Sequence, residues 1–241
     1  MTNLKYSEIE SKRFEREIYR GAIDELDIDL LRAFYAHHDQ DTLIFRIPVA
    51  EQHKMHMLNG LGKEVINADT LVYYEADLQH TESHPIRNTD IDFRHIADED
   101  KGVFEELIPK IFNNYTNHYF SNPVLDKTKI AEGYMEWVMN SFGIPGNLYV
   151  VAYRDDQPIA FITCSHNAAY AEIVLNGVLP QYQKGGVYAD LIRYVKQYFG
   201  QLGTPLLRVS TQIQNFPVQR VWNKEGFVMT NAFVTVHLNK K

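Results

Sequence analysis

The segment with the most chemical information is a short loop that ends in a glycine pair, Gly185 and Gly186. It follows an apolar run over residues 171–180, which we predict as a strand, and precedes an amphipathic run over 187–203, which we predict as a helix. At such a turn the backbone N–H groups and the helix dipole both favour an anion. The loop therefore predicts a phosphate or pyrophosphate site, although a capped strand-to-helix turn would carry the same glycines.

Two further features carry possible chemistry, and we interpret both as structural. His53 and His56 form an H-x-x-H pair in a predicted helix, but the glutamate and the third ligand of a zinc protease are missing. We expect surface histidines there and no metal site. Cys164 lies in an apolar strand, where a buried core thiol is the commoner role than a nucleophile.

The region around the glycine loop resembles the GNAT superfamily of acyl-CoA N-acyltransferases. A Val-x-Pro run at 178–180 is followed by a segment similar to the family motif Q/R-x-x-G-x-G/A at 183–188. Tyr188 stands where the family has glycine or alanine, a departure that leaves contacts through backbone N–H groups possible. The run over 207–227 is similar to the family's strand, asparagine, helix and terminal Gly-Phe. The resemblance covers residues 90–241 and, within the superfamily, is closest to sugar-nucleotide N-acetyltransferases of the TDP-fucosamine type.

The resemblance implies acetyl-CoA as the acyl donor, held through its pyrophosphate and its pantetheine arm. A bulge in the strand over 171–180, made possible by Gly177, would separate neighbouring strands and free a backbone N–H near Val178 for the thioester carbonyl. Asn215 would bond to the pantetheine arm. The residues that we expect to bind the donor are Val178, Leu179, Gln183, Lys184, Gly185, Gly186, Val187, Tyr188 and Asn215.

The general base is left open among four residues: Glu172, Asn176 acting through water, His118 and His166. Glu172 lies on the strand that would present the thioester, but a strand glutamate is more often a solvated or ion-paired residue. His118 lies in an aromatic loop where the family binds its acceptor, and a histidine there can take a proton near neutral pH. A packed polar loop explains the same residues.

The proton donor for the thiolate is where the sequence departs from the family. A tyrosine commonly faces the sulfur from the last helix, and the matching position here is Trp222. An indole N–H donates a hydrogen bond but does not deliver a proton. Either Tyr188, Ser210, a water molecule or solvent supplies the proton, or Trp222 only walls the sulfur pocket.

The resemblance and these departures from it leave three functions. The first is acetyl transfer to a small-molecule primary amine, with an amino sugar attached to a nucleotide as the expected acceptor. The second is a CoA-binding module without catalysis, which the departures at Trp222 and Tyr188 keep open. The third is acetyl transfer to peptide or protein amines, which the net charge permits.

The elements that must position these residues indicate a mixed α/β fold of the α+β type, with a largely antiparallel sheet flanked by helices. Strands are predicted at 42–48, 65–78, 91–96, 148–154, 158–165, 171–180, 206–212, 227–230 and 232–238, and helices at 50–62, 100–112, 129–142, 187–203 and 216–226. Asp155-Asp156-Gln157 between two of the strands indicates a hairpin.

A polar run over residues 81–90 suggests a division into a truncated N-terminal half-domain, 1–89, and a GNAT-like domain, 90–241. The N-terminal region echoes the C-terminal end. Arg46 precedes Gly62 much as Arg208 precedes Gly226, and an Asn-Ala pair follows each glycine at the same distance. The N-terminal region is therefore either a partial repeat of the strand-helix-strand unit or an unrelated βαβ unit whose helix also ends in glycine.

Composition limits the partners. The chain of 241 residues has 24 Lys and Arg against 31 Asp and Glu, a net charge of −7 that argues against nucleic acid as a bulk electrostatic partner. A single cysteine makes no internal disulfide, the charged start is unlike a signal peptide, and the apolar runs are too short to span a bilayer. We expect a cytoplasmic protein without membrane contact, and the oligomeric state stays open, a homodimer included.

Overall fold

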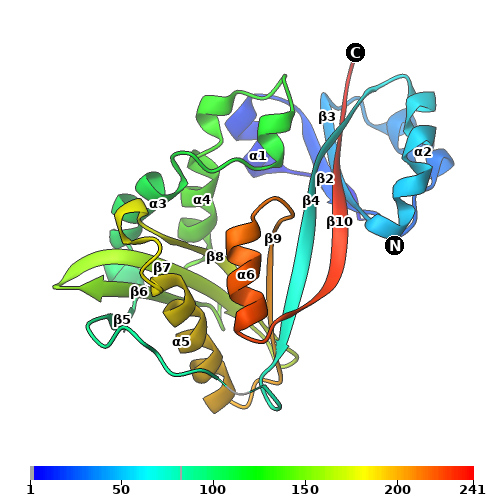
Figure 1. The fold of residues 1–241 in the computed structure, drawn as a ribbon. Helices are drawn as coiled ribbons and strands as arrows, with labels where there is room; N and C mark the ends of the chain where they lie inside the picture. Colours follow the sequence, from blue (N-terminus) through cyan, green and yellow to red (C-terminus); the bar gives the residue numbers. More distant parts are fainter. Residues whose placement is uncertain (1–2, 82) are drawn as a thin grey trace. The chain divides into compact units, whose positions relative to one another are not determined.

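The chain folds into two compact units that are interleaved along the sequence, and the computed structural model describes residues 3–81 and 83–241 (Figure 1). The first unit contains residues up to Val72, Thr116–Ile130 and Asn231–Lys241. The second unit contains Tyr73–Tyr115 and Ala131–Thr230. Strands β4 (Glu64–Asp77) and β10 (Val228–Asn239) therefore supply residues to both units.

In the first unit the strand order is β1-β2-β3-β10-β4. β2 and β3 are parallel and are joined by helix α2, whereas β1 and β10 run antiparallel to their partners β2 and β3. The other elements of this unit are β1 (Lys5–Tyr6), α1 (Glu8–Phe14), β2 (Ile18–Ala22), α2 (Ile28–His37), β3 (Thr42–Pro48) and the 3-10 segments η1 (Val49–Leu61), η3 (His118–Ser121) and η4 (Lys127–Lys129).

In the second unit the strand order is β4-β9-β8-β7-β6-β5. β5 to β8 pair antiparallel, and β8 and β9 are parallel with α5 between them in sequence. Its elements are β5 (Asp92–His95), η2 (Asp98–Asp100), α3 (Val103–Phe112), α4 (Glu132–Ser141), β6 (Leu148–Arg154), β7 (Gln157–His166), β8 (Ala171–Val178), η5 (Pro180–Tyr182), α5 (Val187–Gln201), β9 (Leu206–Gln212) and α6 (Phe216–Lys224).

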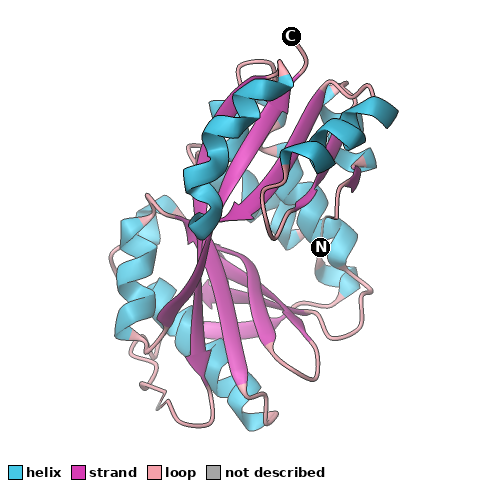
Figure 2. Ribbon diagram, turned by 90° about the vertical axis from the view of Figure 1, so that its right-hand side faces the viewer, coloured by secondary structure: helices cyan, strands magenta, loops and turns pink. Residues whose placement is uncertain are grey.

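Helices lie beside the strands in both units (Figure 2). In the second unit α3 and α4 bring Phe104, Leu107 and Tyr134 against Phe161 and Leu175 of β7 and β8. In α5 the buried apolar residues recur at helical spacing along one side, as the amphipathic pattern predicts. The expected fold class, a mixed α/β architecture with a largely antiparallel sheet, is confirmed.

Local signals predicted some elements well and others poorly. The hairpin between β6 and β7 forms at Asp155 and Asp156, whose φ angles of 49° and 58° suit a tight turn of the primed type. The predicted helix over 50–62 is a 3-10 segment, and the two predicted strands over 227–238 are one continuous strand. β2 and α2 escaped prediction, because the strand is five residues long and its neighbours are charged.

The division at residue 89 stays a prediction, as does the internal repeat. Two stretches of the chain share one order of elements, a parallel strand pair joined by a helix, then a further helical segment and a long strand. It runs as β2, α2, β3, η1 and β4 in one case and as β8, α5, β9, α6 and β10 in the other. This order is what a repeat requires, although other βαβ units share it.

Candidate active site

β8 and β9 pair over a short stretch that ends beside a bulge. The paired positions run from Ala171 opposite Leu207 to Ile173 opposite Val209. On the other side of β8 the register to β7 shifts by one residue, which leaves Val174 as the extra residue of the bulge. The predicted bulge thus exists, but its assignment to Gly177 was wrong.

The hydroxyl of Thr163 holds this bulge. Its Oγ1 accepts from the N–H of Leu175 at 3.1 Å and donates to the carbonyl of Leu175 at 3.2 Å. Gly177 has another reason to be glycine, because a Cβ there would come within 2.3 Å of Cγ2 of Ile111 on α3. The glycine therefore permits the close packing of α3 on β8.

Beyond the bulge, alternate N–H groups of β8 point away from β7. The N–H of Leu175 is bound to Thr163, and the N–H of Leu179 donates to the carbonyl of Ile159 at 2.9 Å, so both point toward β7. Since successive N–H groups of a strand point to opposite edges, those of Asn176 and Val178 point toward β9. There the strand pairing has already ended, which leaves these two groups able to polarise a carbonyl.

The glycine loop follows directly. Lys184 and Gly186 both have left-handed backbones, with φ of 71° and 83°, and Gly186 is the N-cap of α5 without any side-chain cap. The Gln183 amide donates to the carbonyl of Val178 at 3.2 Å, which ties the loop back to β8. Such a turn at an uncapped helix start presents backbone N–H groups to an anion.

Asn88 and Asp190 fix the orientation of this loop. The Asn88 amide donates to the carbonyl of Gly185 at 3.1 Å and to the Asp190 carboxylate at 2.6 Å. Asp190 also accepts from the backbone N–H groups of Arg87 and Asn88, each at 3.0 Å. Arg87 and Asn88, which belong to the polar run predicted as a linker, are therefore hydrogen-bonded to α5.

Arg193 extends this cluster to the end of α6. Its guanidinium donates to Asp190 at 2.8 Å and to both carboxylate oxygens of Glu225 at 2.6 and 3.1 Å, and all three side chains are buried. Burial by itself would raise the pKa of Asp190, but hydrogen bonds from Arg87, Asn88 and Arg193 outweigh it and lower the pKa. The sequence prediction missed this cluster. The sequence feature that indicates the cluster is the presence of two charged residues, Asp190 and Arg193, among the buried apolar positions of α5.

Tyr188 and Trp222 meet in this unit. The indole Nε1 donates to the Tyr188 hydroxyl at 2.8 Å, and Trp222 is only 1% exposed. Because an indole only donates, the hydroxyl oxygen is the acceptor and its own hydrogen stays free for another acceptor. Burial raises the pKa of Tyr188, so the phenol keeps its proton at neutral pH.

Neighbouring polar groups include several that the sequence singled out. The Asn215 amide donates to Thr211 Oγ1 at 3.0 Å from the N-cap of α6. Asn176 is half-buried on β8 and, within the described residues, its amide makes no hydrogen bond to a side chain. Glu172 lies opposite Arg208 in the register of β8 and β9. The Glu172 carboxylate acts electrostatically on the Arg208 guanidinium, so Glu172 has a charged neighbour on β9.

His166 and His118 have structural partners. The His166 ring lies 2.9 Å from Thr204 Oγ1 and packs against Phe199. His118 belongs to the first unit, where it is buried with its Nδ1 2.9 Å from Nε2 of His237. Burial and the nearby charges lower the pKa of His118 well below its ordinary value. These surroundings favour the packed polar loop over the proton acceptor, and the catalytic role of His118 stays a prediction.

The side chains that we interpreted as structural occupy ordinary environments. Cys164 is buried, and burial raises the pKa of its thiol, which makes it a poor nucleophile. His53 and His56 are exposed and each bonds a backbone carbonyl within η1. Over residues 3–81 and 83–241, no group of three or more His, Cys, Asp or Glu side chains is arranged to hold a metal ion. In the same residues, no helix has the length and apolarity to cross a bilayer.

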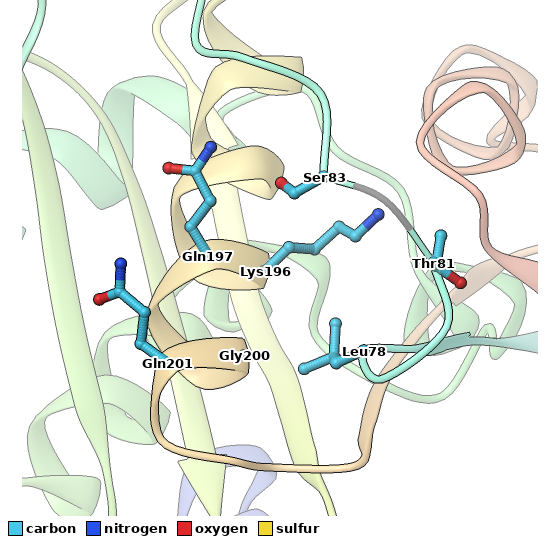
Figure 3. A pocket seen from close by; sticks show the side chains of 7 residues that line it. All are labelled: Leu78, Thr81, Ser83, Lys196, Gln197, Gly200 and Gln201. Carbon is cyan, nitrogen blue, oxygen red and sulfur yellow. The ribbon is translucent and has the colours of Figure 1, made fainter.

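A hollow of about 320 Å³ lies at the other end of α5, lined by Leu78, Thr81, Ser83, Lys196, Gln197, Gly200 and Gln201 (Figure 3). The Lys196 ammonium donates to the carbonyl of Glu225 at 2.6 Å. Figure 3 shows Gln197 and Gln201 directed away from Lys196. The hollow brings together none of the catalytic candidates.

Residues 110–227, about half of the chain, match the model of the acetyltransferase (GNAT) family. Three solved structures are similar in fold. A tandem GNAT protein from the clavulanic acid biosynthesis pathway is 14% identical, with 92% of this chain and 75% of that one covered at a TM-score of 0.62. A GCN5-related N-acetyltransferase from Kribbella flavida is 14% identical, with 93% and 81% covered at 0.56. A GCN5-related glucosamine N-acetyltransferase region of a fungal multi-domain beta-N-acetylglucosaminidase is 11% identical, with 80% and 25% covered at 0.58.

No curated protein matches the chain significantly in sequence. The family match contains β8, the glycine loop, α5 and α6, which are the elements that carry the site described above. The chain therefore carries a GNAT-family acetyltransferase domain, and the protein is an acyltransferase.

Replacement of Gly185 by alanine tests the loop. A Cβ at Gly185 would meet its nearest atom at 3.7 Å, and its φ is not left-handed, so the fold tolerates the methyl group. A ligand that lies directly on the backbone N–H groups of the loop would clash with that methyl group. We expect G185A to weaken acetyl-CoA binding roughly tenfold, about 1.4 kcal/mol, in a calorimetric titration.

The matched control is Gly200→Ala near the end of α5, the helix that follows the loop, where a Cβ meets nothing within 4 Å. It should leave acetyl-CoA affinity unchanged and stabilise the helix by up to about 1 kcal/mol. Equal affinity in G185A and the wild type would remove the loop from the donor site.

Asp190→Asn tests the buried cluster. The amide cannot accept all the bonds of the carboxylate and leaves Arg193 short of a counter-ion, so unfolding free energy should drop by about 3–5 kcal/mol at pH 7. Asp98→Asn, which breaks an exposed pair with Lys101, should cost less than about 1 kcal/mol. Urea melts measure both.

The pH dependence has a definite sign. Because the folded pKa of Asp190 is lowered, its stabilisation is complete above the unfolded value of about 3.9 and is lost as pH falls through the folded pKa. The wild type should therefore lose more stability than D190N on acidification below about pH 4. Parallel acid limbs for the two proteins would contradict this role.

Proposed function

We propose that the protein transfers the acetyl group of acetyl-CoA to a small-molecule primary amine. The observation that carries the proposal is the juxtaposition, within one unit, of diverging strands β8 and β9 with the glycine loop at the start of α5. The divergence offers room for the pantetheine arm beside β8, and the loop offers N–H groups to the pyrophosphate. In this proposal the donor-binding residues are those expected from the sequence: Val178, Leu179, Gln183 to Tyr188, and Asn215.

In this proposal the N–H of Val178 or Asn176 polarises the thioester carbonyl and then stabilises the tetrahedral oxyanion. Hydrogen-bond donors that are already oriented act strongly in a site that excludes water. The bulge at Val174, fixed by Thr163, supports this role because it ends the pairing of β8 with β9 just before these two groups.

Tyr188 is our candidate for the acid. The neutral amine attacks the thioester carbon, and collapse of the intermediate breaks the carbon–sulfur bond and leaves a thiolate. The phenol gives its proton to that sulfur and regains one from solvent. Trp222 is a positioning residue here, since its N–H holds the phenol oxygen and stabilises the phenolate that forms. This assignment replaces Trp222 itself as the catalytic group.

For the base we favour Asn176 acting through a water molecule, since its half-buried amide lies beside the proposed oxyanion site on β8. Glu172 remains the second candidate. The amine bound to the enzyme loses its proton to water ordered by one of these side chains.

The acceptor that we propose is an amino sugar attached to a nucleotide. Two observations support it: the resemblance to sugar-nucleotide N-acetyltransferases, and the likeness in fold to the glucosamine N-acetyltransferase region. A CoA-binding module without catalysis and a peptide acetyltransferase are the alternatives. We also propose that residues 1–89 form a truncated repeat of the domain over 90–241 and that the protein works in the cytoplasm, where its one buried cysteine stays reduced.

Substitution at Tyr188 separates proton transfer from binding. Tyr188→Phe should lower kcat by about 100-fold with little change in the KM for acetyl-CoA, because general acids contribute about 100-fold or more. Trp222→Phe should lower kcat less, since it removes only the orientation of the phenol. Steady-state thiol release measures both, and an unchanged kcat in Y188F would assign the proton to water or Ser210.

A thiol-release screen tests the activity itself. Acetyl-CoA is offered with TDP- and UDP-linked amino sugars, polyamines and peptides, and the release of free CoA is followed with a thiol reagent. We expect release with a nucleotide-linked amino sugar. A Tm raised by acetyl-CoA but no release with any amine would support the CoA-binding module instead.

A further inference from the structure

The sheet of the first unit has one apolar and one polar face. Leu43, Phe45 and Ile47 of β3 point into an apolar core shared with Leu31 of α2 and Leu58 of η1. The alternate residues of β3 point to the opposite face. On that second face the register aligns Arg20 with Ile44, Ala22 with Arg46, and both residues of β3 with partners on β10, His237 and Thr235.

A cavity of about 200 Å³ lies on this second face. It is lined by Arg20, Ala22, Ile44, Arg46, His118 and Thr235, all of which belong to the first unit. Its polar lining consists of two guanidiniums, one imidazole and one hydroxyl, and it includes no carboxylate.

The hydrogen-bond network behind the cavity determines which ring nitrogen of His118 carries hydrogen. The Asn122 amide donates to Nδ1 of His237 at 2.9 Å, so that nitrogen accepts. Burial lowers the pKa of His237 to about 4, so the ring is neutral and its hydrogen lies on Nε2, which donates to Nδ1 of His118. His118 is neutral as well, which places its own hydrogen on Nε2 as a donor.

Two groups at the cavity make no well-formed hydrogen bond or ion pair within the described residues. The Thr235 hydroxyl is buried, with the residue 1% exposed, and makes no well-formed hydrogen bond. Its polar neighbour is the Asp69 carboxyl, whose pKa it lowers slightly. Arg46 is half-buried, and within residues 3–81 and 83–241 its guanidinium makes no hydrogen bond or ion pair. By contrast, Arg20 is held by Glu10 at 2.7 Å. An unpaired buried hydroxyl is costly and rare in native proteins, and it indicates a ligand.

We propose that this cavity binds the oxyanion of a small molecule, a phosphate or a carboxylate group. Arg46 supplies the unpaired positive charge, and the hydroxyl of Thr235, the Nε2–H of His118 and the outer edge of Arg20 supply donors. A guanidinium matches a planar or tetrahedral oxyanion with two parallel bonds. The volume suits a compact metabolite, since it is smaller than the 300–1,000 Å³ or so of typical ligand pockets.

Two acidic residues lie nearby, and both are consistent with this assignment. Glu10 is buried and already paired with Arg20, and the second is Asp69. Asp69 makes no ion pair with Arg46 in the described residues, and one of its carboxylate oxygens is buried without a partner. Burial raises the pKa of Asp69, and the smaller opposing effects of Thr235 and Arg46 do not cancel it. The shift disfavours the charged form that would repel the ligand. None of the residues of the site belongs to the glycine loop, and His118 is the one that is also a candidate for the general base.

The test is an NMR titration of the 241-residue protein with inorganic phosphate and, separately, with acetate. CoA is present throughout, so that the glycine loop is occupied. We expect saturable binding of at least one anion, and the stronger of the two identifies the ligand group. Arg46→Gln should weaken it at least tenfold. Arg32→Gln removes an exposed arginine of the same unit and should leave the affinity unchanged.

A second variant guards against a folding defect. Thr235→Val replaces the hydroxyl by a methyl group of similar size, and a Tm of the ligand-free protein close to that of the wild type shows that the variant folds. The same variant should weaken anion binding severalfold. Failure of both anions to bind the wild type, or equal affinities in the wild type and R46Q, would overturn the proposal.

Discussion

The Asp190 carboxylate accepts hydrogen bonds from two backbone N–H groups, the Asn88 amide and the Arg193 guanidinium, and the position of the glycine loop depends on this buried group. Asn88 in turn binds the carbonyl of Gly185. A peptide whose carbonyl is held on one side presents its N–H on the other, so the cluster orients the loop before any ligand arrives. Preorganised N–H groups bind an anion without further loss of backbone entropy.

The same logic applies to the sheet. A regular strand satisfies all its N–H groups with its neighbours, and such a strand has none to offer a substrate. β8 differs from a regular strand by one extra residue, Val174, which forms a bulge. The Thr163 hydroxyl stabilises this bulge as both a hydrogen-bond donor and an acceptor. The protein therefore gives up a few strand hydrogen bonds, and the N–H groups of Asn176 and Val178 become available for chemistry.

The first unit shows how buried polarity is distributed around a sheet. One face is wholly apolar, whereas the other carries Arg46, His237 and Thr235. His237 is satisfied on both ring nitrogens, by His118 at Nε2 and by Asn122 at Nδ1. The exceptions at Arg46 and Thr235 stand out because buried polar groups are nearly always paired.

The sequence by itself determined the fold class, the hairpin at Asp155 and Asp156, and the glycine loop that begins α5. These depend on periodicity and on local backbone preferences, which a short window of residues contains. Only the tertiary structure decided which residue forms the bulge and that Tyr188 meets Trp222. Tyr188 and Trp222 lie 34 residues apart along the chain, and the hydrogen-bonded histidines His118 and His237 lie 119 residues apart. No local pattern records a hydrogen bond of that span, because its geometry exists only after the strands and helices have packed.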